Sequence, residues 1–199
     1  MEKIQTIELT IKDEEDGVFA ISLVNSPAIE EDFVALSKEN NSTKFKVEAK
    51  VVDTDRKIVV GFALVPDKPI LRVKDDKKFN IKFSKETVSK SAELYMKNLN
   101  LANVTSEHST PVKDCCVIES WIVEDAKNDK SNIYNLGAKG GEWVVMMKLS
   151  DEEYKKAKDG TYKGFSIEAL YDGFEQLNSK VEETLTEDEV IDLLKEIVK

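Results

Sequence analysis

The sequence has only two cysteines, and they are neighbours, Cys115 and Cys116. Adjacent residues of a strand point to opposite faces, so this pair offers neither a disulfide framework nor the ligand spacing of a zinc site. We therefore expect a protein of a reducing compartment that binds no metal and needs no cofactor.

Long apolar runs and basic clusters are also lacking. The longest apolar run, residues 58–65, is far shorter than the roughly 20 residues of a membrane-spanning helix. The first residues lack the apolar core of a signal peptide. A formal net charge of −10 argues against binding a nucleic-acid backbone. We expect a soluble intracellular protein whose partners are proteins, with no membrane or nucleic acid among them.

Histidine is the scarcest of the residues that carry out acid–base chemistry, because His108 is the only one in the chain. A serine in an unusual place, Ser166, lies between two large apolar residues on a predicted buried strand. A buried hydroxyl without a hydrogen-bond partner costs about 1–3 kcal/mol. Gly164, two positions earlier, lets another backbone or a ligand come close. If Ser166 is a nucleophile, His108 is the base that this sequence offers.

Hydrophobic patterning predicts a chain made mostly of strands. The run over residues 58–65 is apolar on both faces and predicts a central strand. Ser84 is a predicted N-cap for a helix over residues 85–98, and a capping box at Ser150 predicts a second, short helix. We expect one main domain over residues 1–172, an acidic linker over 173–185, and an amphipathic C-terminal helix over 186–199. The remaining predicted strands cover residues 4–11, 18–24, 45–52, 70–73, 79–83, 101–108, 115–123, 143–149 and the segment around Ser166.

A turn at residues 111–114 would join two of these strands as a hairpin. In that pairing His108 falls opposite Val117, with Glu119 as a diagonal neighbour within reach of a long side chain. A slip of one residue would remove this contact, because it turns every side chain to the other face.

Four short segments, in this order, resemble the prohead (capsid maturation) proteases of tailed bacteriophages, closest to the XkdF-like group. The segments are Thr105-Ser106-Glu107-His108, Glu119-Ser120-Trp121-Ile122-Val123, Gly141-Glu142-Trp143 and Gly164-Phe165-Ser166-Ile167-Glu168. The resemblance covers roughly residues 18–172. Such proteases are serine peptidases related in fold to assemblin, the herpesvirus maturation protease. The resemblance therefore implies a closed, mostly antiparallel β-barrel surrounded by helices.

The resemblance also implies roles for individual residues. Ser166 would be the nucleophile and His108 its general base, with an acidic residue as the third member of the site. Glu119 is the first choice for that residue, and Glu168 is the second because it shares a strand face with Ser166. Glu107 is the third choice, since adjacent strand residues point apart.

The implied function is a serine endopeptidase that works inside the phage procapsid, in the host cytoplasm. Its substrates would be the scaffold protein, the major capsid protein and the chain itself, and it could form a homo-oligomer. The alternative is a catalytically inactive capsid-assembly or cargo protein with the same barrel fold.

Overall fold

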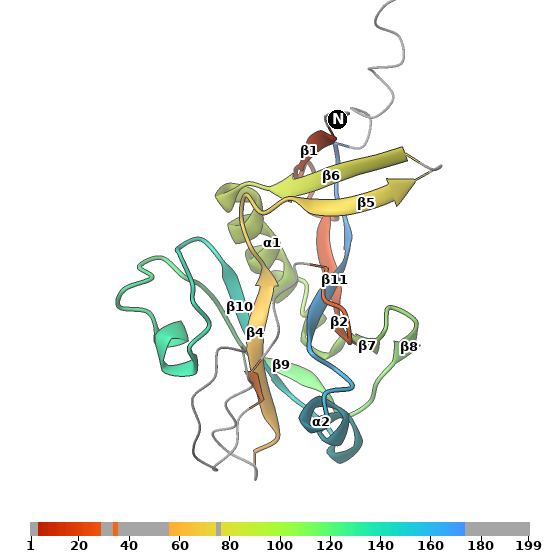
Figure 1. Cartoon of the computed structure of the whole chain (residues 1–199), viewed down its shortest axis with the longest axis vertical. Helices are drawn as coiled ribbons and strands as arrows, with labels where there is room; N and C mark the ends of the chain where they lie inside the picture. Colours follow the sequence, from red (N-terminus) through yellow and green to blue (C-terminus); the bar gives the residue numbers. More distant parts are fainter. Residues whose placement is uncertain (1–3, 29–33, 36–55, 75–76, 174–199) are drawn as a thin grey trace, which may run out of the picture.

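A computed structural model of the protein describes residues 4–28, 34–35, 56–74 and 77–173 (Figure 1). Three predicted features lie outside these residues: the strand over 45–52, almost all of the acidic linker over 173–185, and the terminal helix over 186–199. The described part is a mixed α/β structure that consists mostly of strands.

The described strands form three sheets. The strand orders are β1-β6-β5, β3-β4-β10-β9 and β11-β2-β7-β8. The first sheet contains β1 (Gln5–Leu9), β5 (Ile70–Lys74) and β6 (Lys77–Phe83). The second contains β3 (Val34–Ala35), β4 (Ile58–Leu64), β9 (Cys116–Ile122) and β10 (Trp143–Lys148). The third contains β2 (Gly17–Val24), β7 (Val104–Ser106), β8 (Thr110–Pro111) and β11 (Gly164–Leu170).

All three sheets are open, which corrects the expectation of a closed barrel for the described strands. Closure would require a partner on both sides of every strand. In each sheet the first and last strands are paired on one side only, among the described strands. Most pairings are antiparallel, as expected, but β1–β6 and β2–β7 are parallel. Parallel pairs need long crossover connections, which alternation of apolar residues does not reveal.

The helices begin where the sequence predicts. In α1 (Lys85–Lys97) the Ser84 hydroxyl accepts the backbone N–H of Thr87 at 3.1 Å. In α2 (Asp151–Lys158) the Ser150 hydroxyl accepts the N–H of Glu153 at 3.2 Å. Each cap satisfies a donor that the first turn of a helix leaves free. Neither α-helix of the described residues has the length and the run of apolar residues needed to cross a lipid bilayer. Two short 3-10 helices, η1 (Asn100–Ala102) and η2 (Lys130–Tyr134), complete the described elements.

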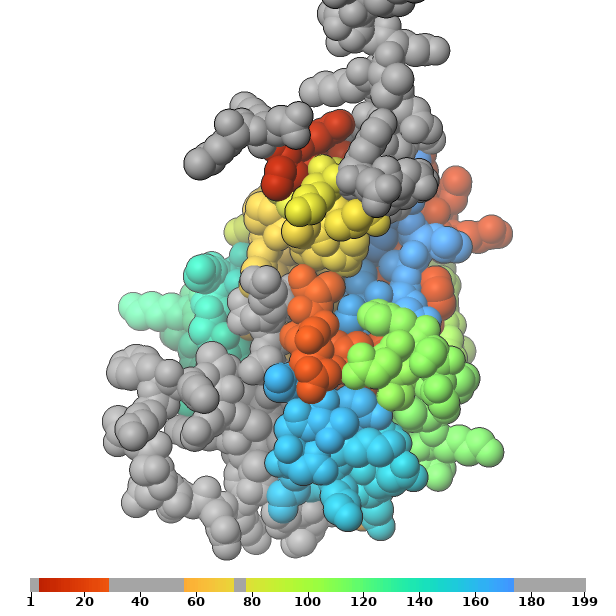
Figure 2. Space-filling model, turned by 45° about the vertical axis from the view of Figure 1, so that its right-hand side comes forward, coloured from red at the N-terminus to blue at the C-terminus, as the bar shows by residue number. Residues whose placement is uncertain are grey.

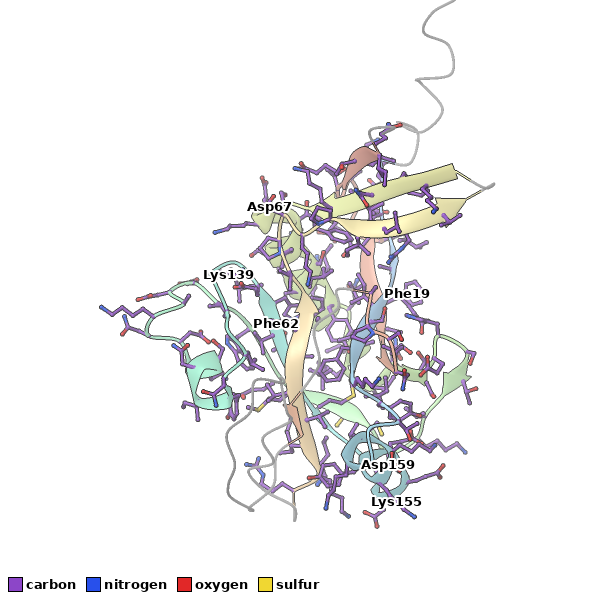
Figure 3. All side chains as sticks on the ribbon, in the orientation of Figure 1. Phe19, Phe62, Asp67, Lys139, Lys155 and Asp159 are labelled. Carbon is purple, nitrogen blue, oxygen red and sulfur yellow. The ribbon has the colours of Figure 1, made fainter. Side chains whose placement is uncertain are left out.

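One hydrophobic core draws buried side chains from all three sheets and from α1. Every residue of β4 is buried, and the strand is paired on both sides, which confirms the predicted central strand. Side chains fill the space between β4, where Phe62 lies, and the β2–β11 pair (Figure 3). Phe165 of β11 is completely buried in this core. One face of β11 is therefore fixed against the core, which directs the alternate residues of the strand to the other face.

The predicted hairpin is wrong. β7 ends at Ser106 and pairs with β8, whereas β9 pairs with β10 and places Val117 opposite Met147. The chain reverses at residues 107–109, before the predicted turn. The cause is local backbone geometry, because Glu107 and His108 both have left-handed conformations, with φ of 49° and 56°. This early turn takes His108 away from the second sheet.

Candidate active site

Three hydroxyl side chains lie in a row across the third sheet. Ser166 of β11 is directly opposite Ser22 of β2, and Ser22 is in register with Thr105 of β7. Residues paired in this way share a face of the sheet. Glu168, two residues beyond Ser166, has its side chain on the same face. The hydrogen bond from Thr105 Oγ1 to Glu168 Oε1 agrees with this placement.

The turn that carries His108 is held in place by β2. The Glu107 N–H donates to the Leu23 carbonyl at 3.0 Å, and the His108 N–H donates to Ser22 Oγ at 2.9 Å. The Asn25 N–H donates in turn to the Glu107 carboxylate at 2.8 Å. Left-handed backbone is uncommon for residues other than glycine and persists where the surroundings stabilise it. These three bonds supply that stabilisation.

The imidazole of His108 lies beside the carboxylate of Glu168. His108 Nδ1 is 3.5 Å from Glu168 Oε1, the same oxygen that accepts the Thr105 hydroxyl. The His108 side chain is 43% exposed and that of Glu168 is 21% exposed. Thr105 therefore fixes a half-buried carboxylate at the ring nitrogen of a more accessible imidazole. With Nδ1 facing Glu168, Nε2 is the nitrogen left for a second partner.

Ser22 connects the histidine to the candidate nucleophile. Its backbone pairs with that of Ser166, and its completely buried hydroxyl holds the backbone of His108. Ser166 itself is 6% exposed. Figure 2 shows the surface formed by the strands of the third sheet. The green segment of β7 and β8 lies next to the orange-red segment of β2 and the blue segment of β11. The structure therefore brings Ser166, His108 and Glu168 to one face of a single sheet.

The other two acidic candidates have different partners. Glu119 lies on β9 in the second sheet, and its carboxylate binds Lys130 Nζ at 2.7 Å. The Lys130 ammonium also lies over the Trp121 ring, 3.9 Å from its centre. Glu107 is next to His108 in sequence, but its carboxylate accepts the Asn25 N–H. The carboxylate beside the imidazole is thus the second choice from the sequence, Glu168, and not the first choice, Glu119.

Sequence reasoning missed Ser22 and Thr105. A signal for Ser22 was present, since Ala20-Ile21-Ser22-Leu23-Val24 places a serine inside an apolar strand just as the segment around Ser166 does. Thr105 had no comparable signal, because threonine is an ordinary strand residue.

Within the described ranges, no cluster of three or more His, Cys, Asp or Glu side chains has an arrangement that could hold a metal ion. The groups that the described residues bring together at the site are a hydroxyl, an imidazole and a carboxylate. In this order the three groups can activate a serine oxygen for attack on a carbonyl carbon.

Comparison with known proteins points to the same chemistry. A family model described as "Putative phage serine protease XkdF" matches residues 44–175, which is more than half of the chain. The match includes both residues of the candidate pair, His108 and Ser166, and all three acidic candidates. Neither the curated proteins nor the solved structures gave a match to this chain.

Proposed function

The chain belongs to the XkdF family of phage serine proteases, and we propose that it is a serine endopeptidase of procapsid maturation. One observation carries the proposal: the only imidazole of the chain contacts a carboxylate on the sheet face that bears Ser166. The proposed substrates are the scaffold protein, the major capsid protein and the chain itself. The proposed place of action is the interior of the procapsid in the host cytoplasm.

The arrangement supports an acyl-enzyme mechanism. Ser166 Oγ attacks the scissile carbonyl carbon while His108 Nε2 takes its proton. The tetrahedral intermediate then collapses, the peptide C–N bond breaks, and the imidazolium gives the proton to the leaving amine. Water hydrolyses the resulting serine ester by the same proton route. This sequence of steps releases two peptides and returns the enzyme to its starting state.

Glu168 has two tasks in this mechanism. A carboxylate next to Nδ1 favours the tautomer that carries its proton there, which leaves Nε2 as the acceptor for the serine proton. Its negative charge also stabilises the imidazolium that forms during attack. Thr105 keeps the carboxylate in place by donating a hydrogen bond to Oε1.

A fluorophosphonate probe tests the proposal directly. Such a probe reacts with serines that an adjacent base has activated, so we expect it to label the full chain at Ser166, as mapped by peptide mass spectrometry. The label should be lost in Ser166→Ala and kept in the control Ser89→Ala, which removes an exposed serine of α1. A folded wild-type chain that takes up no label would contradict the proposal and favour the alternative, a non-catalytic assembly or cargo protein.

Ser22→Ala should slow the reaction through the position of the histidine. The substitution removes the acceptor of the His108 N–H and loosens a left-handed turn. Misplacing a catalytic group by about 1 Å costs on the order of 100-fold in rate, so we expect kcat to fall about 10- to 100-fold with KM nearly unchanged.

The matched control for Ser22→Ala is Ser131→Ala, which removes another completely buried serine, in η2, an element outside the third sheet. It should leave kcat unchanged. Equal losses of activity in the two variants, in step with equal losses of thermal stability, would mean that Ser22 acts only through general stability of the fold.

A further inference from the structure

Strand β5 has large apolar residues on its exposed face and a cation on its inward face. Ile70 and Arg72 face the interior, while Leu71 and Val73 are 51% and 62% exposed. A strand with one solvated face normally places its apolar residues inside and its charged residues outside. Here a cation occupies an inward position between apolar neighbours, and two large apolar residues face solvent. Hydrophobic burial does not account for the position of Arg72.

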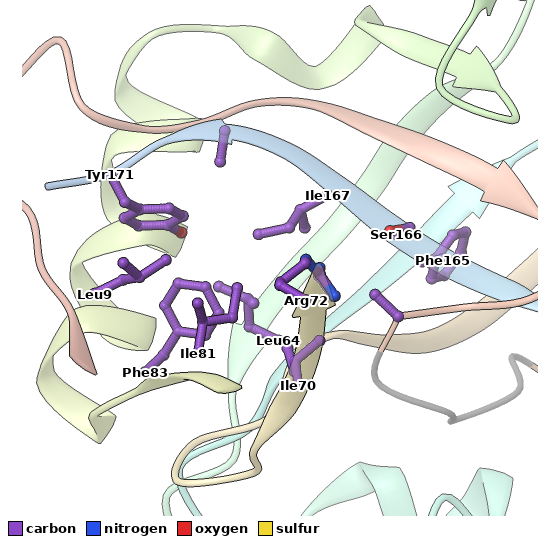
Figure 4. A pocket seen from close by; sticks show the side chains of 13 residues that line it. Leu9, Leu64, Ile70, Arg72, Ile81, Phe83, Phe165, Ser166, Ile167 and Tyr171 are labelled. Atoms are coloured by element: carbon purple, nitrogen blue, oxygen red, sulfur yellow. The ribbon is translucent and has the colours of Figure 1, made fainter. Parts of the chain in front are cut away.

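Arg72 lines a cavity of about 180 Å³. The apolar part of the lining comes from five strands, β1, β4, β5, β6 and β11, and includes Leu9, Leu64, Ile70, Phe83, Phe165 and Ile167. Figure 4 shows Arg72 in the middle of this lining, between Ile167 and Leu64. The cavity therefore has hydrocarbon walls around one guanidinium group.

Few neighbouring groups of the described residues neutralise the positive charge of the Arg72 guanidinium. Burial lowers the pKa of Arg72 from its ordinary value. Its Nη1 donates to the neighbouring carbonyl of Leu71 at 3.0 Å, and no carboxylate of the described residues forms an ion pair with it. A guanidinium has five N–H donors in a fork that matches a carboxylate. A partly buried cation that no carboxylate of the described residues neutralises is unfavourable, so the site favours the arrival of an anion.

The same cavity reaches the candidate nucleophile. Ser166 contributes to its lining, together with the neighbouring residues Phe165 and Ile167 (Figure 4). A peptide bound with its scissile bond at Ser166 can therefore place a side chain in the cavity. Cavities that hold drug-sized molecules measure about 300–1,000 Å³. The smaller volume found here suits a single side chain.

We propose that this cavity is a substrate subsite that binds an acidic side chain, with Arg72 as the partner of its carboxylate. The inference rests on the proposed function, because it places the substrate at Ser166. Apolar walls contact the methylene groups of the side chain, so glutamate fits better than the shorter aspartate. The chain has a net charge of −10, so its overall field does not attract an acidic peptide and the attraction is local to Arg72.

Cleavage of peptide pools tests the subsite. The pools carry an acetyl group at one end and an amide at the other, so a fixed glutamate is compared with its uncharged isostere glutamine without interference from terminal carboxylates. In each pool one position at a time is fixed as Glu, Gln or Lys. At one position we expect the full chain to favour Glu over Gln at least 10-fold in kcat/KM. Arg72→Met should bring this ratio close to 1, and Arg72→Glu should favour Lys.

The control is Lys78→Met, which removes a positive charge from the exposed surface of the neighbouring strand β6. It should keep the preference for Glu. Arg72→Gln is a second, polar variant for use if Arg72→Met does not fold. A preference for Glu that survives in the Arg72 variants, or the absence of such a preference at every position, would overturn the inference while leaving the peptidase function intact.

Binding separates failure of the subsite from failure of the proposed function. Fluorescence anisotropy of the labelled Glu and Gln pools with Ser166→Ala measures recognition without turnover. The subsite is supported if Ser166→Ala binds the Glu pool more tightly than the Gln pool and the double variant Ser166→Ala, Arg72→Met does not. This result would support the subsite even if the wild-type chain cleaves nothing. Equal binding of both pools to Ser166→Ala would overturn it.

Discussion

Replacing Ser166 with alanine should abolish proteolysis and leave the protein folded. The hydroxyl is the atom that forms the acyl-enzyme, and without it only binding and polarisation of the substrate remain. Loss of the nucleophile or of the base costs on the order of 10⁶ in kcat in a well-studied serine protease. Ser166 is 6% exposed, and alanine leaves no unpaired polar side-chain atom in its place. The chain is co-expressed with scaffold protein, and its intact mass is measured before and after incubation. We expect the mass to fall for the wild-type chain and to stay unchanged for Ser166→Ala.

His108 should be equally indispensable, because no second histidine can replace it. His108→Ala places alanine at a φ of 56°, which strains the turn. His108→Asn is the better variant, since asparagine adopts the left-handed region more easily. We expect the double variant with Ser166→Ala to be no less active than either single variant, because the two residues act as a unit.

Thermal unfolding provides the control for these variants. Their melting temperatures should stay close to that of the wild-type chain, which separates loss of chemistry from loss of structure. Cleavage at the wild-type rate by a folded Ser166→Ala or His108→Asn chain would remove that residue from the mechanism. If a contaminating protease caused the cleavage seen in the wild-type sample, the same cleavage would also appear in the samples of both variants.

Glu168→Gln should lower kcat by about 10²- to 10⁴-fold, whereas Glu119→Gln should leave it unchanged. An amide at position 168 has the shape of the carboxylate but not its charge, and its NH₂ group favours the wrong tautomer of His108. The 3.5 Å contact between His108 Nδ1 and Glu168 Oε1 underlies this expectation. Glu119 lies on β9 in another sheet, where it binds Lys130 of η2, and it has no contact with the imidazole in the part of the chain that the structure describes.

The two glutamine variants form a matched pair, because each removes one negative charge and neither changes side-chain size. Steady-state kinetics on one peptide measures both. We expect the loss in Glu168→Gln to fall on kcat rather than KM, since the carboxylate acts on the transition state. The opposite result, an impaired Glu119→Gln beside an active Glu168→Gln, would identify Glu119 as the third member. Full activity in both would mean that the mechanism uses neither carboxylate.

Local features of the protein were predictable from the sequence. The serine caps of both α-helices depend on residues three positions apart, and the structure has them where they were expected. The central position of β4 follows from an unbroken apolar run. Membership of the phage serine protease family was also predicted, from a resemblance in four short segments, and a family model matches residues 44–175.

The pairing of strands was not predictable. β7 joins β2 in parallel across a separation of about 80 residues, and β9 joins β10 instead of pairing with the strand before it. Alternation shows that a segment is a strand but does not name its neighbour, and a shift of one residue exchanges its two faces. For this reason the sequence led first to Glu119, on a strand that belongs to a different sheet.

The sequence by itself determined which side chains were available: one imidazole, a serine in an apolar strand, and several nearby carboxylates. Only the tertiary structure decided that Glu168 contacts His108, that Ser22 holds the histidine turn, and that Arg72 faces a cavity lined in part by Ser166. The physical reason is the range of the interactions. Caps and apolar runs involve residues close together along the chain, whereas these contacts depend on the register and packing of strands that are distant in sequence.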